Sequence, residues 1–190
     1  MAKKTIKKSW IAIGIVILIL LWFWSGFNGL VRKDEIDKAQ WANVETSYQR
    51  RFDLIPNLVN TVKGAAQQDL DVFTQIAEAR TRYSGAGSID QKAAAATEIE
   101  SALSRLLVIV ENYPTLKSQE SYLALIAELE GTENRISVER RRYNDTVREY
   151  NTAIRVVPKN IVAGLFGFDA HELFEATEGS DVAPVVDFEE

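Results

Sequence analysis

One heptad pattern, between Tyr122 and Val157, limits most strongly what this chain can fold into. Alternating steps of four and three residues reach eleven positions, of which nine are apolar or aromatic: Tyr122, Ile126, Leu129, Glu133, Ile136, Arg140, Tyr143, Val147, Tyr150, Ile154 and Val157. An unbroken 3.5-residue repeat places such positions on one face of a helix that packs along other long helices. With Ser118 as its N-cap and Pro158 as its end, this helix is about 60 Å long. The pattern predicts an all-α bundle.

Two charged residues, Glu133 and Arg140, interrupt this apolar face about 10 Å apart along the helix axis. An opposite charge from a neighbouring helix stabilises such a residue, and the pair then fixes the register of the bundle. We therefore expect both side chains to face inward and to pair with the helices predicted at 34–83 and 90–112. The candidate partners are Arg51, Asp53, Arg105 and Glu111. A catalytic use of Glu133 and Arg140 with Asp53 is the less favoured alternative.

The stretch 34–83 carries a second apolar face, again in steps of three and four residues: Trp41, Val44, Tyr48, Phe52, Ile55, Val59, Val62, Ala66, Leu70, Phe73 and Ala77. This face predicts one long amphipathic helix. Pro56 lies inside it, and a proline in a helix interior removes a backbone hydrogen bond at a cost of about 3 kcal/mol. Either the helix kinks at Pro56, or it ends there and the chain doubles back. The unbroken phase of the face across Pro56 favours the kink.

A loop at 84–88 separates this helix from the next. Ser88, with Gln91 three residues later, predicts a capping box at the start of a helix over 90–112. The apolar residues of that helix again recur at helical spacing: Ile99, Leu103, Leu106 and Val110.

The chain beyond Pro158 contains the apolar segment Ile161–Phe168, which is too short to span a bilayer. The default interpretation is a short helix that caps the bundle; a partner contact and an interfacial segment remain alternatives. The tail 181–190 is acidic, and its proline indicates an extended conformation.

The N-terminus predicts a membrane anchor. Residues 1–9 are basic, and 10–31 contain no charge; the 21 residues from Trp10 to Leu30 span about 31 Å, which matches a hydrocarbon core of roughly 30 Å. A cleaved signal peptide is disfavoured because the apolar run is too long and no small-residue cleavage site follows. Four lysines precede the span, which slightly favours a cytoplasmic N-terminus and an extracytoplasmic bundle.

The composition argues against an enzyme. The chain has no cysteine, and its one histidine, His171, cannot supply the two Glu-x-x-His motifs of a di-iron bundle. A Ser-His-Asp arrangement would have to recruit His171, which lies far in sequence from the predicted helices. No phosphate-binding or nucleophile motif is present, so we predict no catalytic residue, cofactor or metal site. From Arg32 onward, 18 basic residues face 27 acidic ones, a net charge of −9 that disfavours nucleic acid.

Several sequence blocks, read together, resemble the bacterial LemA family. These blocks are Arg50–Val59 (RRFDLIPNLV), Thr61–Gly64 (TVKG), Glu111–Pro114 (ENYP) with Leu116–Lys117, Gly131–Ile136 (GTENRI), Arg141–Asn144 (RRYN), Tyr150–Asn151, Phe166–Phe168 and the tail from Ala183 to Phe188. Gln67-Gln68-Asp69 departs from the family, whose members often carry a His-Glu pair there. The resemblance implies one N-terminal anchor followed by an antiparallel helical bundle. It implies no catalysis and supplies no site residues.

The organisation predicted from these observations has four parts: a basic segment (1–9), a transmembrane helix (10–31), a LemA-like bundle of three to four long helices (32–158), and a short apolar helix with an acidic tail (159–190). We expect a non-enzymatic scaffold in the bacterial cytoplasmic membrane that contacts lipid and self-associates beyond a dimer, because Tyr150, Ile154 and Val157 lack a partner from the shorter third helix. An adaptor for a membrane protease or another envelope enzyme is the alternative. No small-molecule substrate is evident.

Overall fold

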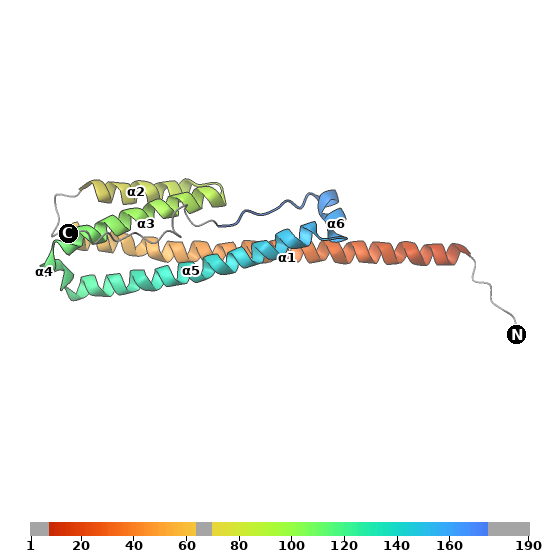
Figure 1. The fold of residues 1–190 in the computed structure, drawn as a ribbon, viewed down its shortest axis with the longest axis horizontal. Coiled ribbons are helices and arrows are strands. Elements are labelled where there is room, and N and C mark those ends of the chain that lie inside the picture. The colour runs from red at the N-terminus through yellow and green to blue at the C-terminus, as the bar shows by residue number, and fades with distance from the viewer. Residues whose placement is uncertain (1–7, 64–69, 175–190) are drawn as a thin grey trace, which may run out of the picture.

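The protein, described by a computed structural model over residues 8–63 and 70–174, is built from helices (Figure 1). The predicted all-α fold is confirmed, and within the described ranges there is no strand. The helices are α1 (Lys8–Lys63), α2 (Leu70–Gly85), α3 (Ile89–Glu111), α4 (Pro114–Lys117), α5 (Glu120–Arg155) and α6 (Lys159–Phe166).

Helix α1 is continuous over 56 residues, about 84 Å, and it carries both the predicted span and one helix of the bundle. Gly26, Asn28 and Gly29, which all have low helix propensity, lie at the end of the predicted span. The backbone stays helical through all three residues, so the boundary proposed between residues 31 and 32 falls inside α1. In Figure 1 the N-terminal part of α1 projects alone beyond the bundle.

Pro56 lies inside α1, so it does not separate two helices. The prediction of one helix over 34–83 is nevertheless wrong, because α1 ends at Lys63 and α2 begins at Leu70. The two helices are neighbours: the Lys63 ammonium lies 5.3 Å from the centre of the Phe73 ring. The burial pattern of α2 does not continue that of α1. Its buried apolar residues are Phe73, Ile76, Ala79 and Tyr83, whereas Ala77 is exposed.

Four helices, the second half of α1 with α2, α3 and α5, form the antiparallel bundle (Figure 1). The predicted face of α3 is buried at all four positions, and on α5 the apolar residues Tyr122, Leu129, Ile136, Tyr143 and Val147 are buried with them. The capping box is also confirmed, because the Ser88 hydroxyl accepts a hydrogen bond from the Gln91 amide.

The start of α5 differs from the prediction. Ser118 does not cap it; Ser118 is the C-cap of the short helix α4, and the N-cap of α5 is Gln119. Pro114 provides the reason, because a proline is well suited to the first turn of a helix and here it starts a separate one.

A second, smaller apolar cluster lies where α1 leaves the bundle. Leu30 of α1, Tyr150, Ala153 and Ile154 of α5, and Val162 and Ala163 of α6 are buried together, and Phe23, Phe27 and Phe168 pack against them. This cluster corrects the expectation that Tyr150 and Ile154 lack a partner. Helix α6 covers them from within the same chain, and Val157 alone of the three is exposed.

Candidate functional site at the junction of anchor and bundle

Two asparagines of α5 hold the segment that follows α6. Asn151 accepts a hydrogen bond from the backbone N–H of His171 and donates one to its carbonyl, both at 2.9 Å. One heptad earlier, Asn144 makes the same two bonds with Phe174, at 2.8 and 2.9 Å. Each side-chain amide therefore satisfies both polar groups of one residue of an extended backbone. We call Asn144 and Asn151 the asparagine clamps.

The tyrosine before each asparagine completes this arrangement. Tyr143 is buried, and its hydroxyl donates a 2.9 Å hydrogen bond to the Glu172 carbonyl, between the two clamped residues. Burial, together with the nearby Asp37 carboxylate, raises the pKa of Tyr143 to about 12, so the hydroxyl keeps its proton and remains a donor. Tyr150 stacks on the ring of His171, with ring centres 4.1 Å apart.

His171 lies between two carboxylates of α1. Its Nδ1 is 3.0 Å from Asp37 Oδ2, and its Nε2 is 3.3 Å from Asp34 Oδ1. Carboxylates only accept hydrogen bonds, so both contacts are made when both ring nitrogens carry a proton. The Asp37 side chain is 3% exposed, and the imidazole of His171 is the group that its Oδ2 faces. This contact joins the segment after α6 to the helix that carries the anchor.

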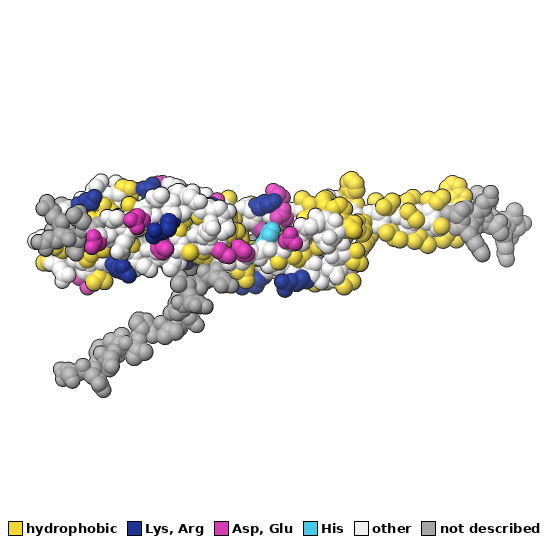
Figure 2. Space-filling view, turned by 90° about the horizontal axis from the view of Figure 1, so that it is seen from above, with side chains coloured by type: hydrophobic (Ala, Val, Ile, Leu, Met, Phe, Trp, Pro, Cys, Tyr) yellow, Lys and Arg dark blue, Asp and Glu magenta, His cyan; other side chains and the backbone are white. Residues whose placement is uncertain are grey.

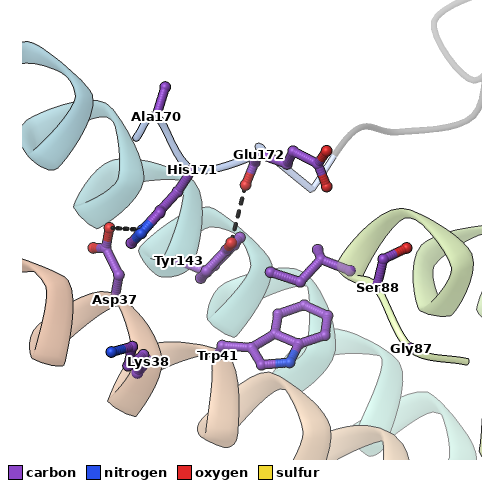
Figure 3. A pocket seen from close by; sticks show the side chains of 10 residues that line it. Asp37, Lys38, Trp41, Gly87, Ser88, Tyr143, Ala170, His171 and Glu172 are labelled. Atoms are coloured by element: carbon purple, nitrogen blue, oxygen red, sulfur yellow. Dashed lines mark hydrogen bonds and ion pairs between the residues drawn. The ribbon is translucent and has the colours of Figure 1, made fainter. Parts of the chain in front are cut away.

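A cavity of about 450 Å³ opens beside His171, and Ser88 and Asp37 also line it (Figure 3). These three residue types suggest a catalytic triad, in which one histidine nitrogen bonds the acid and the other takes the serine proton. Here both ring nitrogens face carboxylates, and the Ser88 hydroxyl caps α3. Figure 3 shows Ser88 on the other side of the pocket from His171. The geometry does not build a triad.

Glu133 and Arg140 both meet opposite charges from neighbouring helices, as the heptad pattern predicted, but only Arg140 is largely covered: its side chain is 21% exposed and that of Glu133 is 44% exposed. Glu133 pairs with Arg51 of α1, and Arg140 pairs with Glu100 of α3 at 2.7 Å and also donates to the Tyr48 hydroxyl. Burial lowers the pKa of Arg140 to about 10, which leaves it charged at neutral pH. Burial also raises the pKa of Glu100.

The partners of Glu133 and Arg140 agree in part with the prediction. Arg51 was among the candidates, whereas Glu100 was not. The other three candidates take no part: Asp53 is exposed and accepts a hydrogen bond from Gln49, Arg105 donates to Gln75, and Glu111 lies exposed at the end of α3. The alternative that combined Glu133 and Arg140 with Asp53 as a catalytic group is not assembled.

The described residues also do not meet the requirements of a metal site. Within residues 8–63 and 70–174, no three histidine, aspartate or glutamate side chains are placed to hold a metal ion. Gln67-Gln68-Asp69, residues 1–7 and the tail 181–190 lie outside the described residues.

The surface at the junction is apolar on the side of the anchor. The N-terminal part of α1 is long and apolar enough to cross a membrane, and no residue of its most apolar 18-residue window is fully buried by the rest of the described chain. Figure 2 shows its hydrophobic side chains continuing onto the end of the bundle. There, α1 and α6 enclose a groove of about 560 Å³ lined by Leu20, Phe23, Trp24, Phe27, Asn28 and Phe166.

The clamps and His171 were missed by sequence reasoning, although one signal was present. The dipeptide Tyr-Asn occurs at 143–144 and again at 150–151, and a seven-residue repeat of one polar residue beside a core residue indicates a second line of contacts on the same helix. Asn144 and Asn151 were noted only as part of a family resemblance. His171 was set aside because of its distance in sequence from the helices it contacts.

Fold and junction together define a class of protein: a four-helix bundle carried on one long helix whose N-terminal part suits a single pass through a membrane. Residues 40–188 match the model of the LemA family, and the chain belongs to this family. The resemblance noted in the sequence is thereby confirmed.

The curated relatives of the chain include magnetosome proteins. "Magnetosome protein MamQ 1" and "Magnetosome protein MamQ 2" of Paramagnetospirillum magneticum (strain AMB-1) are each 27% identical over 186 residues, and "Magnetosome protein MamQ" of Magnetospirillum gryphiswaldense (strain MSR-1) is 28% identical over the same length. Each alignment covers 84% of this chain and 68% of the relative. None of these names states an enzymatic activity.

Proposed function

We propose that this protein is a non-enzymatic scaffold, anchored in a membrane by α1, that self-associates and organises the bilayer around it. The observation that carries the proposal is the continuity of α1 from the anchor into the bundle core, where Tyr48 and Phe52 are buried. The asparagine clamps and His171 fasten the C-terminal segment across the same junction. An anchor and a bundle joined in this way hold a fixed orientation to each other.

Self-association is supported by the anchor and by the far end of the bundle. Anchoring restricts all copies to one plane and one orientation, which raises their effective concentration. At the end of the bundle away from the anchor, Val108 of α3 and Leu123 of α5 are exposed. Val108 and Leu123 are therefore the surface that we expect to meet another copy. Tyr150 and Ile154 are covered by α6 and cannot do so.

Mass photometry of the full-length protein in lipid nanodiscs, or in mild detergent, tests the proposal. We expect assemblies larger than a dimer, and we expect Val108→Glu with Leu123→Glu to shift them toward the monomer. The control is Glu130→Gln, an exposed change on α5. A monodisperse monomer in the unchanged protein would refute self-association and favour the adaptor for a membrane protease or another envelope enzyme.

The cellular arrangement that we propose is the cytoplasmic membrane of a bacterium, with the N-terminus in the cytoplasm and the bundle outside. The support is the excess of lysine before the span, since Lys and Arg are retained on the cytoplasmic side. A cysteine introduced at the exposed Asn134 of this cysteine-free chain tests the orientation in intact cells. A membrane-impermeant maleimide should label it without lysis; labelling only after lysis would place the bundle in the cytoplasm.

A further inference from the structure

Helix α6 presents two different sides. Val162 and Ala163 are buried against α1 and α5, whereas Ile161 and Leu165, one turn apart, are 57% and 70% exposed. Val157, in the turn just before α6, is 71% exposed as well. A contiguous apolar surface of this kind marks a contact with a partner or a membrane.

The depth of α6 along the anchor is fixed by aromatic contacts. The ring of Phe166 lies 4.7 Å from that of Phe27 and 6.3 Å from that of Phe23, centre to centre. The part of α1 that precedes these aromatic contacts, from Trp10 to Trp22, is only about 20 Å long. A hydrocarbon core is roughly 30 Å thick. The lysines before Trp10 limit the span on the other side. A bilayer of ordinary thickness therefore has to reach the level of α6.

We propose that α6 is a second membrane-contacting helix, embedded in the leaflet on the bundle side, and that its groove with α1 binds an acyl chain of a phospholipid. The groove is apolar except for Asn28, the lining residue of α1 that is nearest to the bundle. Asn28 therefore marks the headgroup end. Arg32 lies one helical turn beyond it on the same face, where a lipid phosphate is met.

Lipid is a better occupant of this surface than a second copy of the chain. The groove is continuous with the apolar N-terminal part of α1, which acyl chains surround in a membrane. A second copy bound in the groove would leave Ile161 and Leu165 on the outer side of α6 uncovered. At this depth along α1, the bilayer covers those two residues. The inference depends on membrane anchoring by α1 but not on self-association.

Fluorescent labelling tests the depth of α6, and the absence of native cysteine makes single labels simple. Leu165→Cys on α6, Leu18→Cys on the span and Asn134→Cys on the bundle each receive an environment-sensitive fluorophore. The full-length proteins are placed in vesicles of phosphatidylethanolamine and phosphatidylglycerol. Brominated acyl chains then quench labels in lipid, and iodide quenches labels in water.

We expect the Leu18 and Leu165 labels to be quenched by brominated lipid and protected from iodide, and the Asn134 label to behave in the opposite way. Quenching of the Leu165 label by iodide would refute the embedding of α6 while leaving the anchor intact. Protection from both quenchers would show that protein covers α6, and it would also refute the proposal. Quenching of the Leu18 label by iodide would refute the anchor and the inference together.

The groove has its own test, native mass spectrometry of protein released from these vesicles. We expect the unchanged protein to retain one phospholipid and Phe166→Ala, which removes a wall of the groove, to lose it. Val157→Ala is the control, because Val157 is exposed and does not line the groove. Equal retention by the two variants, or no lipid on the unchanged protein, would overturn the assignment of the groove.

Discussion

Replacing Arg140 by methionine tests the pairing of charges within the bundle. The substitution keeps an unbranched apolar stem but removes the guanidinium that pairs with Glu100 and lies 4.4 Å from the centre of the Phe174 ring. Breaking a fully buried pair costs about 3–5 kcal/mol, and breaking an exposed pair costs about 1 kcal/mol or less. The two side chains are 21% and 27% exposed, so we expect a loss near ~2–3 kcal/mol, below the fully buried range.

Thermal unfolding in mild detergent, followed by circular dichroism, measures the loss. For a chain of this size, ~2–3 kcal/mol lowers Tm by roughly 5–10 °C. The matched control is Arg148→Met on the same helix, whose ion pair with Asp145 is largely exposed and should contribute little. If both variants unfold at the same temperature, the pair is solvated and the register argument fails.

The dependence of this effect on pH has a definite sign. Burial raises the pKa of Glu100 in the folded protein, so the folded state holds that proton more tightly than the unfolded chain does. The contribution of Glu100 to stability is therefore complete below the ordinary carboxyl pKa and is lost as pH rises through the raised value. In the Arg140→Met variant the Glu100 carboxylate lacks its partner at 2.7 Å, so the loss of stability with rising pH is larger. The gap between Arg140→Met and the unchanged protein should shrink toward pH 4, and adding Glu100→Gln should recover part of it at pH 7; a gap independent of pH would refute this account.

Three further outcomes are expected. Intact mass of the protein extracted from membranes should include residues 10–30, and a mature chain lacking them would identify a signal peptide. Gly26→Leu should lower Tm by several degrees and displace α6, because a Cβ there already lies 3.4 Å from a methyl group of α6, whereas Gly29→Leu, with open space around it, should not. Asn151→Ala should speed proteolysis after α6 relative to Asn134→Ala, and equal rates would show that the clamp does not hold that segment.

The parts of the fold that repeat at a fixed spacing were predictable. The faces of α3 and α5 follow from apolar residues at steps of three and four, and the pairing of Glu133 and Arg140 with opposite charges of neighbouring helices follows from their place in the heptad. The same periodicity failed between α1 and α2. Apolar residues that keep a helical spacing in the sequence resemble one long helix even where the helix ends, and α1 ends at Lys63 rather than at Pro56.

The contacts at the junction were not predictable in the same way. The pairing of Arg140 with Glu100 depends on the register of α3 against α5, which no spacing within one helix specifies. His171 reaches Asp37 only because the chain turns back after α6 and two asparagines hold its backbone. A resemblance to known sequences pointed to Asn144 and Asn151 without giving their role.

Because α1 is continuous, a tilt of its membrane part moves the bundle with it. From Val31 to Lys63 the helix extends about 50 Å beyond the span. Transmembrane helices tilt by about 20° on average, and further when their apolar length exceeds the membrane thickness. A tilt of that size swings the far end of the bundle sideways by roughly 17 Å, because no flexible joint within α1 absorbs it. In the membrane-anchored assembly that we propose, local membrane thickness would thereby set the position of Val108 and Leu123, and hence the distance between neighbouring copies.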